Sequence, residues 1–128
     1  MNTQDIGKLL LRVMLGGLLL FHGIDKLTHG ISYIVGLIDI YKLPKEIAYG
    51  VYIGEIVAPI LLILGWKSRW WAAIITINIS FAIYLVHTKH FLSLGQQGAW
   101  SMEVPIFYLF SSLAIATLGS GKYAIKPD

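Results

Sequence analysis

The sequence IGKLLLRVMLGGLLLFHGIDK, which spans Ile6–Lys26, is apolar enough to enter a lipid bilayer. It nevertheless carries Arg12 in its middle, and His22 and Lys26 near its end. An arginine at membrane depth costs roughly 2.5–3.5 kcal/mol on insertion scales, so it persists where it faces other helices and finds a partner. The stretch therefore predicts a helix that packs against others inside a membrane and presents ionisable groups to them.

One face of this predicted helix combines cations with small residues. At about 100° per residue, five positions lie within about 40° of one line along the helix. These positions are Arg12, Gly16, Leu19, Gly23 and Lys26. Because two of the five are glycines, we expect another helix to approach this face closely.

The composition indicates an integral membrane protein. Hydrophobic residues make up 56% of the 128 residues and charged residues 13%, whereas a soluble domain has about 25% charged residues. The mean hydropathy is +0.70. The length predicts a single domain, residues 1–128.

Two further properties of the composition exclude several classes of function. The chain has no cysteine, which rules out disulfides, thiol redox catalysis and thiolate metal sites. The formal net charge is only +3, and no basic run in the sequence indicates a nucleic-acid partner.

Four apolar segments alternate with turn-forming and charged residues. They cover about residues 6–23, 47–64, 70–86 and 102–118, each near the lower limit for crossing a hydrocarbon core of ~30 Å. Between the first two, Ile34, Leu37, Ile38 and Tyr41 recur at helical spacing. We therefore expect an all-α, integral membrane four-helix bundle with a short interfacial helix, around residues 31–41, between helices 1 and 2.

An even number of crossings places both termini on the same side of the membrane. The short loop Lys67–Arg69 lies on that side as well, together with Lys8, Lys122 and Lys126. Because cytoplasmic loops carry an excess of lysine and arginine, we expect both termini in the cytoplasm.

Acidic residues inside the other apolar segments are the candidate partners of the first helix. At ~1.5 Å per residue, Arg12 and Glu55 lie at depths close enough for an ion pair. Glu103 begins the last segment, level with His22, Lys26 and His87. We expect one pocket, open toward the outside, that contains Arg12, His22, Lys26, Glu55, His87 and Glu103.

This cluster has two main interpretations. It could consist of structural ion pairs that fix the register of the helices. It could also be a small-molecule or proton site, since intramembrane ionisable residues are commonly functional. We expect no metal site, because Arg12 and Lys26 oppose a cation, and no arrangement of a catalytic nucleophile is recognisable. Asn78 in the third segment is interpreted as a packing residue rather than a ligand contact.

The order and spacing of these residues resemble those of the DoxX family. The first helix carries Arg12-x3-Gly16-x5-His22-Gly23-x2-Lys26, and the resemblance continues through Leu43-Pro44, Glu55, Gly65, Ser68-Arg69, His87, Glu103 and Gly119-Ser120-Gly121-Lys122-Tyr123. Two departures stand out. The closing Ser-Leu-Asp of the family is replaced by Ala124–Asp128, which leaves Asp128 without an assigned role, and Glu55 is followed by Val57-Ala58 instead of glycines.

The resemblance implies a small, multi-pass, four-helix protein of the bacterial inner membrane. Relatives include DoxD-type subunits of thiosulfate:quinone oxidoreductases, proteins linked to resistance against quinones, and proteins of oxidative-stress complexes. The resemblance does not imply one reaction, because a fold does not define a function.

Three functions are compatible with this reading. The first is a redox-associated membrane protein that binds a quinone-like or similarly small polar-headed ligand and works with an oxidoreductase partner. The sequence leaves open whether the protein also forms a homo-oligomer in the lipid bilayer. No intrinsic cofactor is expected, and quinone is the candidate for a bound one. The second is a non-enzymatic assembly or stabilising subunit whose buried charges are structural. The third, ranked last because the inner half of the bundle offers few polar residues, is a permeation or efflux protein.

Overall fold

The computed structural model describes residues 3–84 and 103–128, and every regular element in these residues is a helix. The long first helix α1 covers Thr3–His29, and the short α2 covers Ser32–Ile40. A continuous helical run follows, made of η1 (Lys45–Tyr49), α3 (Gly50–Tyr52), η2 (Ile53–Val57) and α4 (Ala58–Leu64). The last two helices are α5 (Ser68–Ala82) and α6 (Glu103–Leu118).

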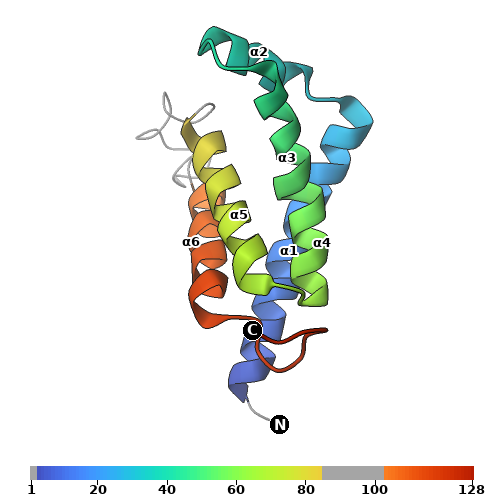
Figure 1. Cartoon of the computed structure of the whole chain (residues 1–128), viewed down its shortest axis with the longest axis vertical. Coiled ribbons are helices and arrows are strands. Elements are labelled where there is room, and N and C mark those ends of the chain that lie inside the picture. The colour runs from blue at the N-terminus through green and yellow to red at the C-terminus, as the bar shows by residue number, and fades with distance from the viewer. Residues whose placement is uncertain (1–2, 85–102) are drawn as a thin grey trace.

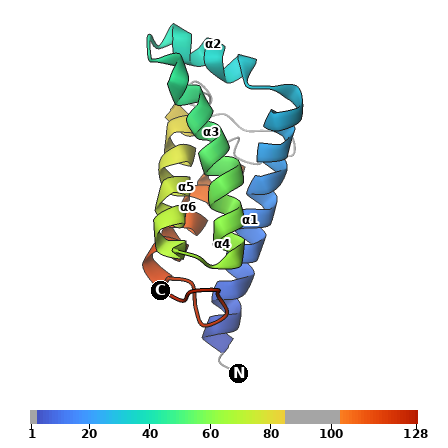
Figure 2. The ribbon, with the colours of Figure 1, turned by 45° about the vertical axis from the view of Figure 1, so that its right-hand side comes forward.

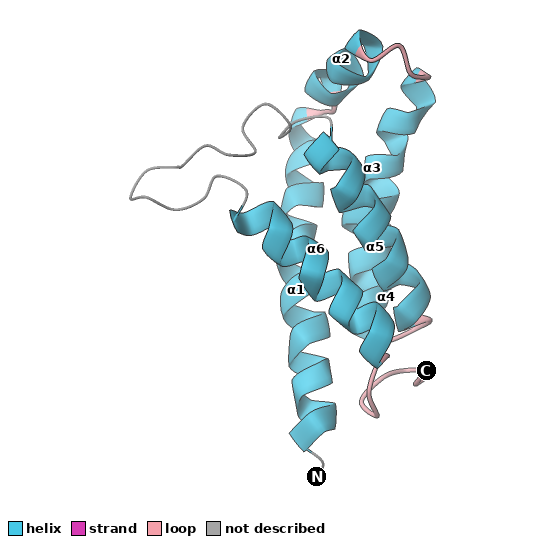
Figure 3. Cartoon of the chain, turned by 90° about the vertical axis from the view of Figure 1, so that its left-hand side faces the viewer, coloured by secondary structure: helices cyan, strands magenta, loops and turns pink. Residues whose placement is uncertain are grey.

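The long elements stand side by side with α2 across one end of the bundle (Figures 1 and 2). Helix α1 contacts α4, η2 and α6, while α5 contacts α4 and α6. Both described ends of the chain lie at the end of the bundle opposite α2 (Figure 1). Figure 3 shows α6 crossing in front of α1 at a slant. The common core is apolar and consists of Leu15, Leu19, Ala58, Leu62, Ala72, Ile75, Ile79 and Ile115.

The outward surfaces of the helices are apolar too. Large hydrophobic side chains are exposed on each long helix, for example Phe21 on α1, Ile77 on α5 and Phe107 on α6. In water such a surface would aggregate, whereas lipid solvates it. Two helical segments, Thr3–His29 and Glu46–Leu64, are long and apolar enough to cross a membrane, and α6 is a shorter apolar helix.

The observed helices overlap all four expected apolar segments. Residues 6–23 lie within α1, which continues to His29, and residues 47–64 lie within the run from η1 to α4. The third segment begins inside α5, and the fourth matches α6; residues 85, 86 and 102 fall outside the described residues. Helix α2 forms where a short helix was expected, and its placement at the membrane interface remains a prediction.

The structure confirms that another helical segment approaches the glycine face of α1 closely. A Cβ atom added at Gly16 would lie 2.9 Å from the Pro59 carbonyl oxygen, and one added at Gly23 would overlap the Glu55 carbonyl. The stripe residues Arg12, Gly16, Leu19 and Gly23 are all buried. Helix α1 and the η2–α4 run therefore meet backbone to backbone, which fixes the height of Glu55 relative to α1.

Candidate ligand-binding site

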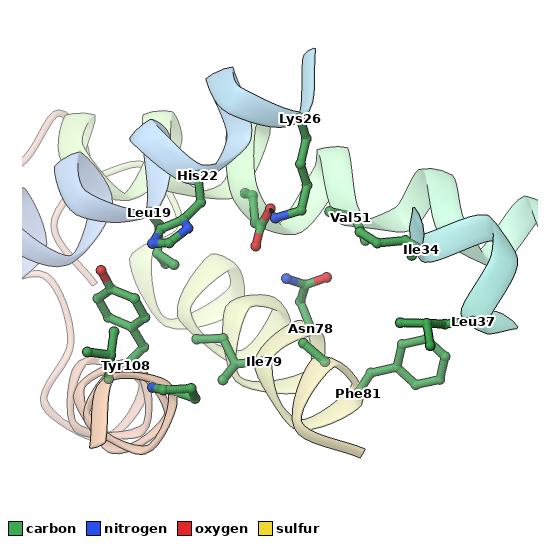
Figure 4. A pocket seen from close by; sticks show the side chains of 14 residues that line it. Leu19, His22, Lys26, Ile34, Leu37, Val51, Asn78, Ile79, Phe81 and Tyr108 are labelled. Atoms are coloured by element: carbon green, nitrogen blue, oxygen red, sulfur yellow. Dashed lines mark hydrogen bonds and ion pairs between the residues drawn. The ribbon is translucent and has the colours of Figure 1, made fainter. Parts of the chain in front are cut away.

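A cavity of about 330 Å³ is lined by residues of α1, α2, α3, η2, α5 and α6 (Figure 4). Its walls are mostly apolar, from residues such as Leu19, Ile34 and Phe81. Its polar lining residues come from four elements and are His22, Lys26, Glu55, Asn78 and Tyr108. A concave, apolar space with a few polar groups is the usual form of a small-molecule site.

The cavity lining contains an ion pair. The Lys26 ammonium donates a hydrogen bond of 2.5 Å to Oε2 of Glu55, and the two side chains are only 23% and 13% exposed. Lys26 comes from the last turns of α1 and Glu55 from η2. We call this space the Lys26–Glu55 cavity.

The backbone that carries Glu55 is a π-helical turn. The Ala58 N–H donates to the Ile53 carbonyl, five residues earlier. Proline at position 59 has no N–H for the Glu55 carbonyl, and its ring would crowd that carbonyl in a regular α-helix. The widened turn relieves this conflict. Single π-turns of this kind are frequent at functional sites.

The side chain of Asn78 on α5 lines the cavity and packs against Gly54 of η2. A Cβ atom at Gly54 would overlap the Asn78 side chain, so only glycine lets the amide pack beside the backbone at Glu55. Figure 4 shows Asn78 pointing toward the end of Lys26. The sequence interpretation of Asn78 as a packing residue is therefore incomplete, because its side chain lines the cavity as well.

Tyr108 on α6 lines the cavity and contacts His22. The two rings meet edge to face, with centroids 5.9 Å apart and planes at 83°. Sequence reasoning missed Tyr108, because an aromatic residue in an apolar segment resembles a lipid anchor. The available signal was its hydroxyl, which sets it apart from Phe107 and Phe110 in the same helix.

Arg12 is not part of this cavity, and the expected Arg12–Glu55 pair is wrong. Arg12 is fully buried and donates to the carbonyl oxygens of Leu62, at 3.3 Å, and Tyr123. The two residues do not pair because they lie at different heights along the axis of α1. Glu55 lies level with Gly23, whereas Arg12 precedes Gly23 by eleven residues, which is roughly 16 Å along a helix.

Of the remaining two expected site residues, the structure describes only Glu103. Glu103 is exposed at the start of α6 and is absent from the cavity lining, although the next two residues, Val104 and Pro105, contribute to it. His87 lies outside the described residues. Across residues 3–84 and 103–128, no three histidine or acidic side chains gather as metal ligands would.

With this geometry established, comparison with known proteins places the chain in a family. Residues 7–88 match the DoxX family, and this range contains both members of the Lys26–Glu55 pair. The chain belongs to the DoxX family. Its members are membrane proteins, in agreement with the apolar outer surface described above.

Two relatives of this DoxX protein show how far the likeness extends. A Bacillus subtilis protein named "Putative oxidoreductase CatD" is 26% identical over 98% of this chain and 89% of its own length. An uncharacterized protein of Haemophilus influenzae is 32% identical over 65% of this chain. The match spans only 54% of the Haemophilus protein. No solved structure matches the chain.

The end of the DoxX bundle opposite the cavity is closed by the last ten residues. Asp128 accepts hydrogen bonds from the backbone N–H groups of Arg69 and Ser120. The tail also pairs with the loop after α4, because Ile125 and Lys126 donate to the carbonyls of Leu64 and Gly65. Asp128, which had no assigned role in the sequence, therefore holds the tail in place beneath Arg12.

Proposed function

We propose that this DoxX protein binds a small ligand with a polar, quinone-like head in the Lys26–Glu55 cavity and acts with an oxidoreductase partner. The observation that carries the proposal is the ion pair inside a mostly apolar cavity of about 330 Å³. Charges in such surroundings interact strongly with a polar ligand, because little water competes with it.

The polar groups around the cavity match the needs of a carbonyl-bearing ring. An ammonium has three N–H donors; Lys26 uses one of them on Glu55, and the others suit a carbonyl or phenolate oxygen. The Glu55 carboxylate can accept a hydrogen bond from a ligand hydroxyl. The Asn78 amide and the Tyr108 hydroxyl offer donors and acceptors on the opposite wall.

These side chains suit proton exchange rather than electron storage. Reduction of a quinone to a hydroquinone consumes two electrons and two protons. Glu55 and His22 can pass protons to and from ring oxygens. A partner oxidoreductase would supply or remove the electrons, and the name of the Bacillus relative is compatible with such an association.

The membrane setting belongs to the same proposal. The described helices would cross the bacterial inner membrane as a multi-pass protein, with both termini in the cytoplasm. The shared position of the two chain ends (Figure 1) and the positive loop Lys67–Arg69 support this orientation. The cavity would then open toward the outer half of the membrane.

Calorimetric titration of a chain-free naphthoquinone into the purified protein in detergent tests the binding. We expect Lys26→Met and Glu55→Gln to weaken the affinity at least tenfold, which corresponds to about 1.4 kcal/mol. Lys122→Met, which removes an exposed lysine far from the cavity, serves as the control. Equal affinities for all four proteins would exclude this cavity as the site.

A second function, that of a stabilising subunit without a ligand, is favoured by one observation. The Lys26 and Glu55 charges already compensate each other within the chain, as a structural pair would. In that case Lys26→Met lowers the unfolding temperature, but no quinone binds to the wild-type protein.

A further inference from the structure

A second hollow, of about 390 Å³, runs along the outside of the bundle between α1 and α6. Its walls are almost wholly apolar and include Leu10, Met14, Leu18 and Phe107, with Ser111 as a polar exception. We call it the α1–α6 groove. It lies on the side where the exposed side chains of α1 and α6, such as Met14 and Phe107, would meet lipid.

The groove and the cavity meet at one residue. Tyr108 lines both of them. On the α1 side the groove ends at Leu18, and the cavity begins with the next residue, Leu19. The two hollows are therefore adjacent along α1 and α6, and the polar lining residues belong mostly to the cavity, whereas the lining of the groove is almost wholly apolar.

We propose that the ligand of this protein is an amphiphile whose single long apolar chain lies in the α1–α6 groove while its polar head occupies the Lys26–Glu55 cavity. The proposal rests on the function proposed above and narrows the ligand class. It favours a membrane-resident molecule over a small, water-soluble one, and it makes the groove the element that determines specificity.

The dimensions support this assignment. The groove extends along α1 from Gly7 to Leu18, which is roughly 17 Å at the rise of an α-helix. From Lys26 to Gly7 the distance along the axis is roughly 28 Å, close to the ~30 Å thickness of a hydrocarbon core. A head at the cavity and a chain along the groove would thus span the apolar layer in the direction that lipid chains take.

The apolar chain of the ligand should strengthen binding through packing contacts with the groove, and not through removal of apolar surface from water. A chain that leaves the bilayer for the groove exchanges one apolar environment for another, so dispersion contacts decide its preference. Filling the groove with protein atoms should therefore lower the affinity for ligands with an apolar chain and leave the affinity for ligands without one unchanged.

Two α1 residues offer a matched pair of variants. Met14 lines the groove and is 57% exposed, whereas its neighbour Val13 is 41% exposed and lines neither hollow. Met14→Trp should fill the groove, and Val13→Trp should add the same bulk on the lipid side. The probes are naphthoquinones with one head and three chains, namely methyl, decyl and polyprenyl.

We expect Met14→Trp to weaken binding of the decyl and polyprenyl probes about tenfold, equivalent to about 1.4 kcal/mol, and to leave the methyl probe unchanged. Val13→Trp should leave all three affinities unchanged. Normal binding of every probe to Met14→Trp would overturn the groove assignment and leave the head site intact. Failure of the methyl probe to bind the wild-type protein would instead overturn the proposed function.

A photoreactive group at the end of the decyl chain provides a second measurement on the folded wild-type protein. Cross-links should map to the groove residues of α1 and to Phe107. A phospholipid with the same reactive group on an acyl chain is the control. Equal labelling patterns from the two probes would mean that the groove holds ordinary lipid, and the proposal would then be wrong.

Discussion

The guanidinium of Arg12 donates a hydrogen bond to the backbone carbonyl of Tyr123, a residue 111 positions later in the chain. The other terminal nitrogen donates to the Leu62 carbonyl. The sequence predicts an acidic partner for the charge of Arg12. In the structure, two carbonyl dipoles stabilise this charge instead, and one of them belongs to the C-terminal tail. Removing the tail would leave a buried cation with fewer acceptors.

The first prediction concerns Asp128, which fastens that tail. Asp128→Ala removes the carboxylate that accepts from the N–H groups of Arg69 and Ser120. We expect a loss of about 1–3 kcal/mol in the free energy of unfolding, measured by denaturation in detergent. Lys126→Ala is the control, because the tail uses only the backbone of Lys126.

A labelling experiment separates loosening of the tail from general unfolding. The chain has no cysteine, so a single Leu62→Cys change creates a unique thiol at a fully buried position beside Arg12. We expect a water-soluble maleimide to react with it faster when Asp128→Ala is also present, at temperatures where both proteins stay folded. Identical reaction rates would show that Asp128 does not hold the tail closed.

The second prediction uses two glycines of α1. A Cβ atom at Gly17 would meet nothing within 4 Å, whereas one at Gly23 would overlap the Glu55 carbonyl. Gly17→Ala should stabilise the helix by up to about 1 kcal/mol. Gly23→Ala should destabilise the protein and weaken quinone binding, because it pushes η2 and Glu55 away from α1. Similar melting temperatures for both variants would contradict the observed backbone contact.

The sequence was sufficient to predict the features that depend on helical periodicity. The burial of Arg12, Gly16 and Gly23 on one face follows from local geometry, which repeats wherever a helix forms. The short helix α2 follows for the same reason, from apolar residues at helical spacing. Pro59 indicates a local disturbance of the helix, because it removes one regular hydrogen bond, but it does not specify the π-turn that forms at Glu55.

The choice of partners across helices could not be predicted in the same way. It depends on the axial position of one helix relative to another, which is set here by the contacts of Gly16 and Gly23 with the run from η2 to α4. The predicted position of Glu55 along α1 was wrong by a few helical turns, so Arg12 was predicted as its partner, whereas Lys26 is the observed one. The capture of Arg12 by a backbone carbonyl has no sequence signature, since every residue carries that group.

The third prediction concerns orientation in the membrane. Both described chain ends lie at the same end of the bundle (Figure 1), next to the loop with Lys67 and Arg69. We expect alkaline phosphatase fused to the C-terminus to be inactive, because this enzyme needs the periplasm, and a fluorescent protein fused there to be bright. Active phosphatase at the C-terminus would reverse the proposed orientation.

The last prediction tests the pairing of Glu55 directly, with two double-mutant cycles on the free energy of unfolding in detergent. Lys26→Met and Glu55→Leu each remove one partner of the 2.5 Å pair, so their effects should couple by about 0.5–3 kcal/mol. The double mutant should therefore recover part of the loss, because no charge of the pair stays unpartnered in the cavity. Arg12→Leu alone should lower the free energy of unfolding more than Lys26→Met alone, since it strips the Leu62 and Tyr123 carbonyls of their donor.

The effects of Arg12→Leu and Glu55→Leu on the free energy of unfolding should nevertheless add within about 0.5 kcal/mol, because the two residues lie at different heights in the bundle. Additive losses for Lys26 and Glu55 together with coupled losses for Arg12 and Glu55 would show that the guanidinium, and not the ammonium, holds the glutamate.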